Sequence, residues 1–279
     1  MADPKVFIII LNWNNFAETS ACLYSLRHLD YANYVVLVID NASTDDSVSR
    51  LRQTFPEVRF FESAKNVGFA GGCNCGIRNA LAGQADYVWL LNNDTLVDAS
   101  ALRALVNRAE RGSRNGAIGS ALYFIDDPER MQVWGGGSID FVLGRSSHFL
   151  RPVPEVQIEF ITGASMLISR PAIESVGLFD EGFFMYWEDA DLCLRLRAAG
   201  WNLGVAADSK VWHKGSTFVG QGSVNSYRYF NASAARFFKR HSSVPLISFW
   251  LGSILRLGKR IVLGDWERTR AVWQGMMHQ

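Results

Sequence analysis

Long apolar runs, a surplus of one charge and paired cysteines are all missing from this chain of 279 residues. No apolar run approaches the ~20 residues that a membrane-spanning helix needs. Lysine and arginine number 28 against 27 acidic residues, so the net charge of +1 offers no basic field for nucleic acid. The first residues lack the basic start and long apolar core of a secretory signal. These absences predict a cytoplasmic protein with no nucleic-acid partner.

Cysteine is scarce, with four residues at positions 22, 73, 75 and 193. Cys73 and Cys75 could supply two thiolates, but no second pair stands nearby to complete a tetrahedral zinc site. We therefore expect reduced thiols rather than disulfides or a zinc centre.

Hydrophobic residues make up 48% of the chain and aromatic residues 13%, as in a folded protein. In the first half, short continuous apolar runs alternate with helical patterns, as buried parallel strands do. We expect strands at residues 6–11, 34–40, 58–62 and 86–92, and helices at 19–29, 47–54, 72–82 and 99–111. This order predicts an α/β fold with a twisted, mostly parallel sheet flanked by helices.

The second half is less regular. Its apolar runs predict strands at residues 117–124, 160–169 and 203–212, and its periodicity predicts helices at 170–177 and 188–199. The glycines at 135–137 and the stretch 138–154 predict a loop. No linker divides these segments into separate domains.

Polar residues follow the predicted strands, at the sheet edge where ligands of such folds bind. Asp40 ends the second strand and could accept a hydrogen bond from a nucleotide base or ribose, or only cap the following turn. Asp94 follows the fourth strand and suits a hard divalent cation that also binds phosphates. His213 follows the last strand as a further ligand or as a structural histidine.

A glycine-rich stretch at residues 66–76 leads into a helix. Glycine lets the backbone approach a ligand, and the start of a helix favours anions. The alternative is that the turn needs glycine for its geometry alone.

An aromatic stretch at residues 183–187 approaches a helix whose first turn carries Glu188, Asp189 and Asp191. Aromatic walls can stack on a sugar and shield a carboxylate from water, as a catalytic base requires. The alternative is that these acids complement the helix dipole, with Asp191 paired to Arg195.

Together these motifs resemble family 2 glycosyltransferases of the GT-A fold, and within them a bacterial rhamnosyltransferase-like branch that builds cell-surface polysaccharide. The resemblance covers residues 5–215 and keeps the family's motif order, at 9–14, 40–47, 66–74, 91–95, 162–164, 177–181 and 187–195. It implies a catalytic domain at residues 1–225, with a donor half at about 1–115 and an acceptor half at about 116–225. Residues 226–279 then form a helical C-terminal extension.

The resemblance also implies roles on the donor side. Asp40 would bind the nucleotide base, and the other residues contacting the donor would be Asn12, Trp13, Asn66, Gly68, Asn74 and Asn93. A divalent metal, Mg²⁺ or Mn²⁺, would be held by Asp94, with His213 as a further ligand. The first acid of the family's D-x-D motif is Asn92 here, which removes a formal charge from the metal site.

On the acceptor side, the resemblance makes Asp189 the general base, with Trp187 and Glu188 lining the acceptor site. The implied reaction is an inverting transfer from a nucleotide-diphosphate sugar to a saccharide or lipid-linked saccharide. On resemblance alone, the first expectation for the donor is dTDP-rhamnose, with transfer of L-rhamnose.

The resemblance thins after Tyr227. Apolar residues there recur at helical spacing, with basic residues largely off the stripe, at Leu246, Phe249, Trp250, Ile254, Leu257 and Ile261. Such a helix can lie at the inner face of the cell membrane, near a lipid-linked acceptor. It can equally pack on the catalytic domain or on a second subunit of a homodimer.

Two other functions compete with sugar transfer. A nucleotidyltransferase of similar fold would want a basic, glycine-rich loop after the first strand, whereas residues 12–15 are Asn-Trp-Asn-Asn. A non-catalytic carbohydrate-binding or scaffolding homologue would have no need of Asp94, Asp189 and His213 together. The sequence favours a glycosyltransferase.

Overall fold

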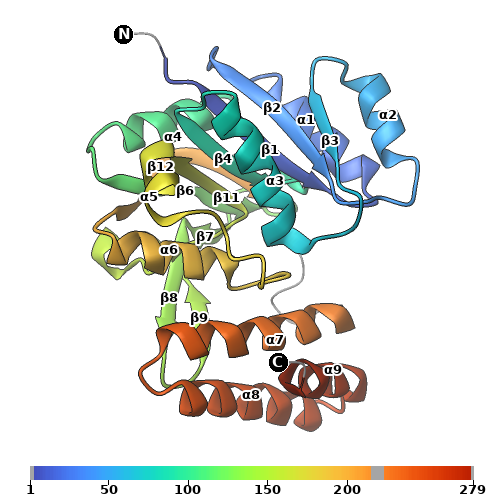
Figure 1. The fold of residues 1–279 in the computed structure, drawn as a ribbon, viewed down its shortest axis with the longest axis vertical. Helices are drawn as coiled ribbons and strands as arrows, with labels where there is room; N and C mark the ends of the chain where they lie inside the picture. The colour runs from blue at the N-terminus through green and yellow to red at the C-terminus, as the bar shows by residue number, and fades with distance from the viewer. Residues whose placement is uncertain (1–2, 215–222, 278–279) are drawn as a thin grey trace.

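The computed structural model describes residues 3–214 and 223–277 (Figure 1). Parallel strands form the first half of its sheet in the order β3-β2-β1-β4: β1 (Val6–Asn12), β2 (Tyr34–Asp40), β3 (Arg59–Glu62) and β4 (Tyr87–Asn92). The helices of this half are α1 (Phe16–Leu26), α2 (Ser47–Thr54), α3 (Gly68–Ala82) and α4 (Ala101–Ala109). Every strand and helix predicted here is confirmed, although α3 begins four residues early.

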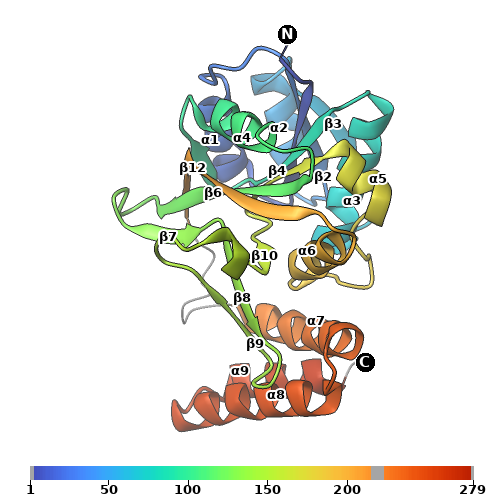
Figure 2. The same ribbon diagram turned by 90° about the vertical axis from the view of Figure 1, so that its left-hand side faces the viewer.

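The inner strands are apolar throughout because helices cover both faces of the sheet (Figures 1 and 2). Ile8 and Ile10 of β1 pack in a core cluster with residues of α1 and α4. Phe7 and Ile9 point the other way, into a cluster with residues of α3 and α6. A strand buried on both faces does not alternate between apolar and polar residues, so its continuous apolar run correctly indicated a buried parallel strand.

The second half extends the sheet in the order β4-β11-β6-β12-β5, with β7 on β6. Its strands are β5 (Thr95–Val97), β6 (Asn115–Phe124), β7 (Met131–Trp134), β11 (Ser165–Ser169) and β12 (Asn202–His213). Strand β11 is antiparallel to both β4 and β6, whereas β12 is parallel to β6. The sheet is therefore parallel in its first half and mixed in its second.

The prediction of a loop at residues 135–154 is wrong in part. Strands β8 (Gly136–Asp140) and β9 (Arg145–His148) form a hairpin, and β10 (Phe160–Ile161) pairs with β8 in a small second sheet. The glycines belong to this sheet, because a Cβ at Gly136 would collide with the Phe160 carbonyl and one at Gly137 with the Ser147 carbonyl. Close backbone approach, rather than a turn, explains them. The predicted strand 160–169 is accordingly split between two sheets.

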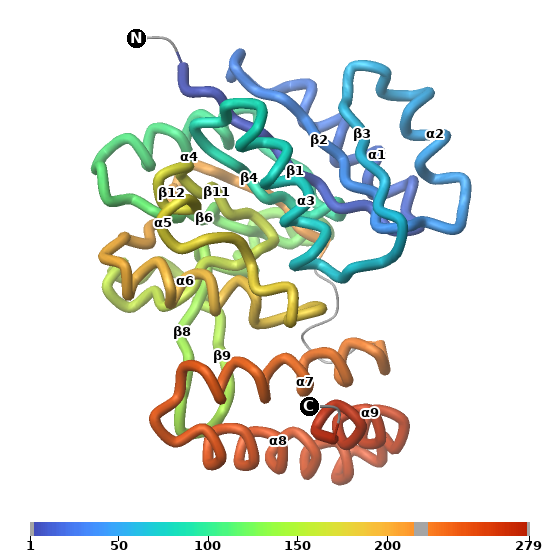
Figure 3. Tube along the Cα trace, viewed as in Figure 1, coloured from blue at the N-terminus to red at the C-terminus, as the bar shows by residue number. Residues whose placement is uncertain are grey.

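Helices α5 (Arg170–Val176) and α6 (Glu188–Ala198) confirm the predictions for this region. The chain then ends in α7 (Val224–His241), α8 (Pro245–Val262) and α9 (Trp266–Met277), which form a layer at one end of the molecule (Figure 3). Ala234, Phe237 and Phe238 of α7 lie in the main core, so the C-terminal helices pack on the α/β part through this helix. Within the two described ranges, no helix combines the length and apolarity needed to cross a bilayer.

Candidate active site

A buried chain of hydrogen bonds joins the carboxyl ends of β1, β2 and β4. Asn12 Nδ2 donates to Asp40 Oδ1 at 2.9 Å, and Thr19 Oγ1 donates to Asn12 Oδ1 at 2.8 Å. Asn93 Nδ2 in turn donates to Thr19 Oγ1 at 2.9 Å. The structure thus connects three of the residues predicted to contact the donor. Sequence reasoning missed Thr19, because nothing distinguishes one threonine on a helix face.

Asp40 has a structural role as well. Its Oδ2 accepts the Ser43 backbone N–H at 2.9 Å, and its Oδ1 accepts the Ser43 hydroxyl at 2.5 Å. These bonds confirm that Asp40 caps the turn after β2. With the bond from Asn12 they make three, and an ionised carboxylate has about four acceptor positions. The carboxylate can therefore still accept one hydrogen bond from a ligand.

The loops after β1 and β2 are bonded to each other and backbone-strained. The Asn14 N–H donates to Ser43 Oγ at 2.8 Å, and the Thr44 N–H donates to Asn14 Oδ1 at 2.7 Å. Asn14 and Ala42 hold positive φ angles of 51° and 61°, which are costly for residues other than glycine and cluster at functional sites. Beside Asn14, the Trp13 ring is 56% exposed and open to a stacking ligand.

The glycine-rich stretch connects the two halves of the molecule. Gly68 has a φ of 76°, and a Cβ there would collide with the Phe184 carbonyl, which accepts the Phe69 N–H at 2.7 Å. Asn66 Oδ1 accepts the Gly68 N–H at 2.9 Å and Asn41 Nδ2 at 3.0 Å. The turn thus needs glycine for its geometry, and contact of Asn66 and Gly68 with the donor stays a prediction.

Asn74 performs a similar connecting role from within α3. Its Oδ1 accepts the Phe179 N–H at 3.0 Å, and its Nδ2 donates to the Phe179 carbonyl and to Glu181 Oε1, both at 2.9 Å. Both ends of the buried amide are engaged by the segment before α6. These bonds assign Asn74 to positioning that segment, and its contact with the donor also stays a prediction.

Asp94 and His213 face each other at the carboxyl ends of β4 and β12. Asp94 Oδ1 lies 3.2 Å from His213 Nε2, and both side chains are largely buried. On the other side of the ring, Gln132 Oε1 lies 2.7 Å from His213 Nδ1. Because that oxygen only accepts, the proton belongs on Nδ1, and the Nε2 lone pair faces the carboxylate.

Two electron-pair donors facing each other fit a divalent cation. Asp94 and His213 are only two ligands, and the described ranges contain no group of three His, Cys, Asp or Glu that could hold a metal ion, so substrate oxygens would have to complete the coordination. Burial raises the pKa of Asp94, but the protonated form of His213, which donates from Nε2 and carries a positive charge, outweighs burial and leaves this pKa below its usual value. Asn92 Nδ2 lies 3.4 Å from His213 Nε2, so the amide that replaces the first acid stands beside the pair.

Asp189 lies at the start of α6, close to the same strand ends. Its Oδ2 accepts the Gly163 N–H at 3.0 Å and its Oδ1 accepts the Ala190 N–H at 2.8 Å. The neighbouring Ala164 carbonyl accepts the Asn92 N–H at 3.0 Å, which ties this turn to β4. Burial raises the pKa of Asp189 despite the two N–H donors. Sequence reasoning included residues 162–164 in a motif but missed the orienting N–H of Gly163, as it missed Gln132.

The residues just before Asp189 are buried and strained. Tyr186 and Trp187 hold positive φ angles of 71° and 70°. The Trp187 ring is only 4% exposed and packs between Phe237 and Phe238 of α7, with centroid distances of 4.6 and 5.1 Å. The expectation that Trp187 stacks on a sugar is therefore wrong for this conformation, because α7 covers the ring. Burial of the Trp187 ring is consistent with the prediction that it shields the adjacent carboxyl groups from water.

Glu188 is buried and incompletely satisfied. Its Oε2 and Trp187 Nε1 are the two buried polar atoms of this turn that lack a hydrogen-bond partner. Burial, and secondarily the charge of Asp189, raise the pKa of Glu188 well above its usual value. Burial thus disfavours the ionised form of Glu188, whereas the N–H groups of Gly163 and Ala190 favour the ionised form of Asp189.

Asp191 belongs to an ion-pair network instead. Its fully buried carboxylate accepts from Arg195 Nε, Arg240 Nη1 and His241 Nε2, each at 2.8 Å. These partners lower the pKa of Asp191 to about 2 although burial opposes them. The predicted pairing with Arg195 is confirmed, and two further partners come from α7. Asp191 therefore anchors the C-terminal extension.

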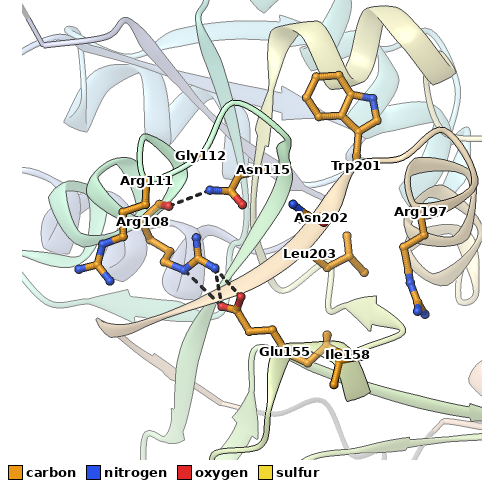
Figure 4. Close-up of a pocket in the computed structure, with 11 residues that line it drawn as sticks. Arg108, Arg111, Gly112, Asn115, Glu155, Ile158, Arg197, Trp201, Asn202 and Leu203 are labelled. Atoms are coloured by element: carbon orange, nitrogen blue, oxygen red, sulfur yellow. Dashed lines mark hydrogen bonds and ion pairs between the residues drawn. The ribbon is translucent and has the colours of Figure 1, made fainter.

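A separate hollow of about 710 Å³ lies at the opposite ends of β6 and β12 (Figure 4). It is lined by residues of α4, of those two strands and of the short helix η1 (Glu155–Gln157). Arg108 forms a bidentate pair with Glu155 in its wall and is thereby neutralised. None of the predicted site residues lines this hollow.

The fold is shared with a solved mannosyltransferase from Pyrobaculum calidifontis, in complex with GDP-Man and Mn²⁺. The TM-score is 0.63 at 17% identity, over 98% of this chain and 74% of that one. The family model described as glycosyl transferase family 2 matches residues 7–177. The chain belongs to glycosyl transferase family 2 and is a glycosyltransferase.

Two relatives with named activities are more similar to this chain in sequence than that mannosyltransferase is. An N-acetylglucosaminyl-diphospho-decaprenol L-rhamnosyltransferase of Mycobacterium tuberculosis is 29% identical over 84% of this chain and 85% of its own length. The low-salt glycan biosynthesis hexosyltransferase Agl10 of Haloferax volcanii is 31% identical over 71% of this chain and 63% of its own. This chain is similar to both proteins.

Proposed function

We propose that this protein transfers a sugar, with inversion, from a nucleoside-diphosphate donor to a saccharide on a lipid carrier, in the synthesis of bacterial cell-surface polysaccharide. The observation that carries the proposal is the group of Asp40, the Asp94–His213 pair and Asp189 at neighbouring strand ends. We further propose L-rhamnose as the sugar and dTDP-rhamnose as the donor. The similarity to the mycobacterial L-rhamnosyltransferase supports that choice.

Donor binding uses the first half of the sheet. The remaining acceptor position of Asp40 takes the ring N–H of the base, which thymine and uracil share. Trp13 stacks on the base from its exposed position beside the strained loop. Asn93, bonded to Asp40 through Thr19 and Asn12, connects the base pocket to the diphosphate region.

The residues present also fit a divalent metal, Mg²⁺ or Mn²⁺. Asp94 and His213 would hold it, with Gln132 orienting the histidine. When bound, the ion would supply positive charge to the departing diphosphate. Because the protein offers one carboxylate and one imidazole, we expect binding of the ion to depend on the donor diphosphate.

Asp189 removes the proton from the acceptor hydroxyl. As that proton moves to the carboxylate, the hydroxyl oxygen bonds to the anomeric carbon from the side opposite the diphosphate. The bond from the anomeric carbon to the diphosphate oxygen breaks with its electron pair on the oxygen, and the configuration inverts. The N–H groups of Gly163 and Ala190 hold the carboxylate in place, and buried Trp187 shields it.

A panel of nucleotides tests the donor assignment. We expect dTDP to raise the melting temperature most, UDP to follow, and Mn²⁺ to increase both shifts, with GDP and CDP inactive. A ligand at ~100 times its Kd adds ~2.7 kcal/mol to the free energy of unfolding, which is readily measured. A larger shift with nucleoside triphosphates would favour a nucleotidyltransferase, and no shift with any nucleotide would favour a non-catalytic homologue.

A further inference from the structure

Helix α8 packs with its polar side toward the protein. Ser248 donates to the Phe141 carbonyl of the β8–β9 hairpin, and Gly252 lies against Gly144 of the same hairpin. Arg256 donates to Asn231 Oδ1 at 2.8 Å and to the Gly144 carbonyl at 2.9 Å. Burial lowers the pKa of Arg256 to about 10. The inner side of α8 also buries Phe249, which packs with Val272 and Met276 of α9.

The opposite side of α8 is apolar and open. Its residues are between 44% and 86% exposed, and we call them the apolar face of α8: Leu246, Ile247, Trp250, Ile254, Leu255, Ile261 and Val262. Phe249, which the sequence placed on this stripe, is buried on the inner side. Helix α8 itself lies along the outer edge of the C-terminal layer, away from the sheet (Figures 1 and 2). A contiguous exposed surface of this kind marks an interaction site.

The C-terminal extension that carries this face is basic and rich in tryptophan. Residues 224–277 contain nine Lys and Arg against two Asp and Glu, although the whole chain carries only +1. Lys239, Lys259 and Arg270 are exposed. Trp250, Trp266 and Trp273 are exposed as well, and tryptophan favours the boundary between water and lipid.

We infer that the apolar face of α8 docks on a bilayer containing anionic phospholipid and lies in the plane of its surface. The inference deepens the proposed function, since it rests on an acceptor that is itself linked to lipid. The exposed cations of the extension complement an anionic surface, whereas a second copy of the chain would present the same cations and be repelled. Helix α7, bonded to Asp191 through Arg240 and His241, then holds α6 and Asp189 at a set distance from the membrane.

Vesicle flotation tests the docking surface on the full chain. Wild-type protein should float with vesicles of phosphatidylcholine and phosphatidylglycerol, and much less with phosphatidylcholine alone or at 0.5 M salt. The triple variant Ile247→Ser, Ile254→Ser, Ile261→Ser should reduce partitioning by up to about a thousandfold, since each buried isoleucine is worth roughly a factor of ten. The matched control Leu150→Ser, Val156→Ser changes exposed apolar residues of another surface and should bind as wild type does.

Three results would overturn the inference. The first is vesicle binding by the triple variant at the wild-type level, and the second is no vesicle binding by the wild type. The third is a wild-type dimer in light scattering that the triple variant converts to a monomer, which would make the face a subunit interface. The rise in melting temperature with dTDP is measured without vesicles. If that rise is seen while vesicle binding fails, the docking surface is wrong but the proposed function stands. Transfer to a water-soluble acceptor should be unchanged in the triple variant.

Discussion

The proposed donor side and the proposed acceptor side of the site differ in how their polar groups are satisfied. On the donor side, Asp40, Asn12, Thr19 and Asn93 satisfy one another in a continuous chain of hydrogen bonds. On the acceptor side, Glu188 Oε2 and Trp187 Nε1 are buried without partners.

The difference corresponds to what each side must do. A pocket that binds a ground state gains from side chains already held in place, because little entropy is then lost on binding. A base must be kept reactive, and desolvation achieves this by raising its pKa. The two sides meet through α3, whose Gly68 and Asn74 contact the segment leading into α6. Mutations should therefore separate binding from chemistry.

The largest effect should come from the base. We expect Asp189→Asn to lower kcat by ~10²–10⁴-fold, because an amide cannot accept the proton of the acceptor hydroxyl. Its donor affinity, measured by calorimetry with dTDP, should stay within about twofold of wild type. Turnover at the wild-type rate would show that another group is the base.

The pH dependence of kcat should reflect the ionisation of Asp189. Because burial raises the pKa of Asp189, its ionised form is lost at a higher pH than that of an exposed aspartate. We expect kcat to fall on the acid side at correspondingly higher pH. An acid limb at the ordinary aspartate position would contradict the shielding by Trp187.

The ion-pair network should matter for stability rather than for chemistry. Asp191→Asn should lower the free energy of unfolding by about 3 kcal/mol, because it leaves Arg195 and Arg240 without their buried carboxylate. Urea denaturation measures the loss. The control Glu174→Gln removes an exposed partner of Arg170 and should cost less than about 0.5 kcal/mol.

The same network predicts acid sensitivity. The pKa of Asp191 falls from 3.8 to about 2 on folding, so its stabilisation is present above pH 4 and is lost as pH falls toward 2. The lost free energy is about 2 kcal/mol. In the Asp191→Asn variant, the free energy of unfolding should fall less steeply as the pH is lowered from 4 toward 2. An unchanged fall would show that other carboxylates cause the acid sensitivity.

The metal pair should have the next effect. Asp94→Asn should lower kcat/KM by roughly a hundredfold, since several kcal/mol of charge stabilisation depend on the ion. Mn²⁺ affinity, measured by electron paramagnetic resonance with dTDP present, should fall in parallel. Affinity without nucleotide should be weak in both proteins, and tight Mn²⁺ binding to the wild type alone would contradict a site shared with the diphosphate.

The smallest effect should come from the exposed end of the network. Arg236→Ala removes a half-exposed partner of Asp180, which keeps Arg240 at 2.7 Å. We expect a loss below about 1 kcal/mol in urea denaturation, because surface ion pairs are screened by solvent. A loss as large as that of Asp191→Asn would mean that Arg236, rather than Asp191, anchors α7.

Much of this site could be predicted from the amino-acid sequence. Continuous apolar runs placed β1, β2 and β4, and the carboxyl ends of parallel strands necessarily meet at one edge, which brought Asn12, Asp40 and Asp94 together. Residues that act through one hydrogen bond left no such signal. Gln132 lies on a short strand that the sequence did not indicate, and Gly163 acts through its backbone N–H.

The sequence by itself determined the parallel half of the sheet, its order of motifs and the carboxylates that follow its strands, because these depend on local periodicity and on strand direction. Only the tertiary structure decided what each polar group meets. It buried Trp187 under α7 and paired Asp191 with α7. It also turned the apolar face of α8 outward, because the β8–β9 hairpin and Asn231 satisfy the polar side of that helix. Helical periodicity defines two faces but cannot say which one the rest of the chain will cover.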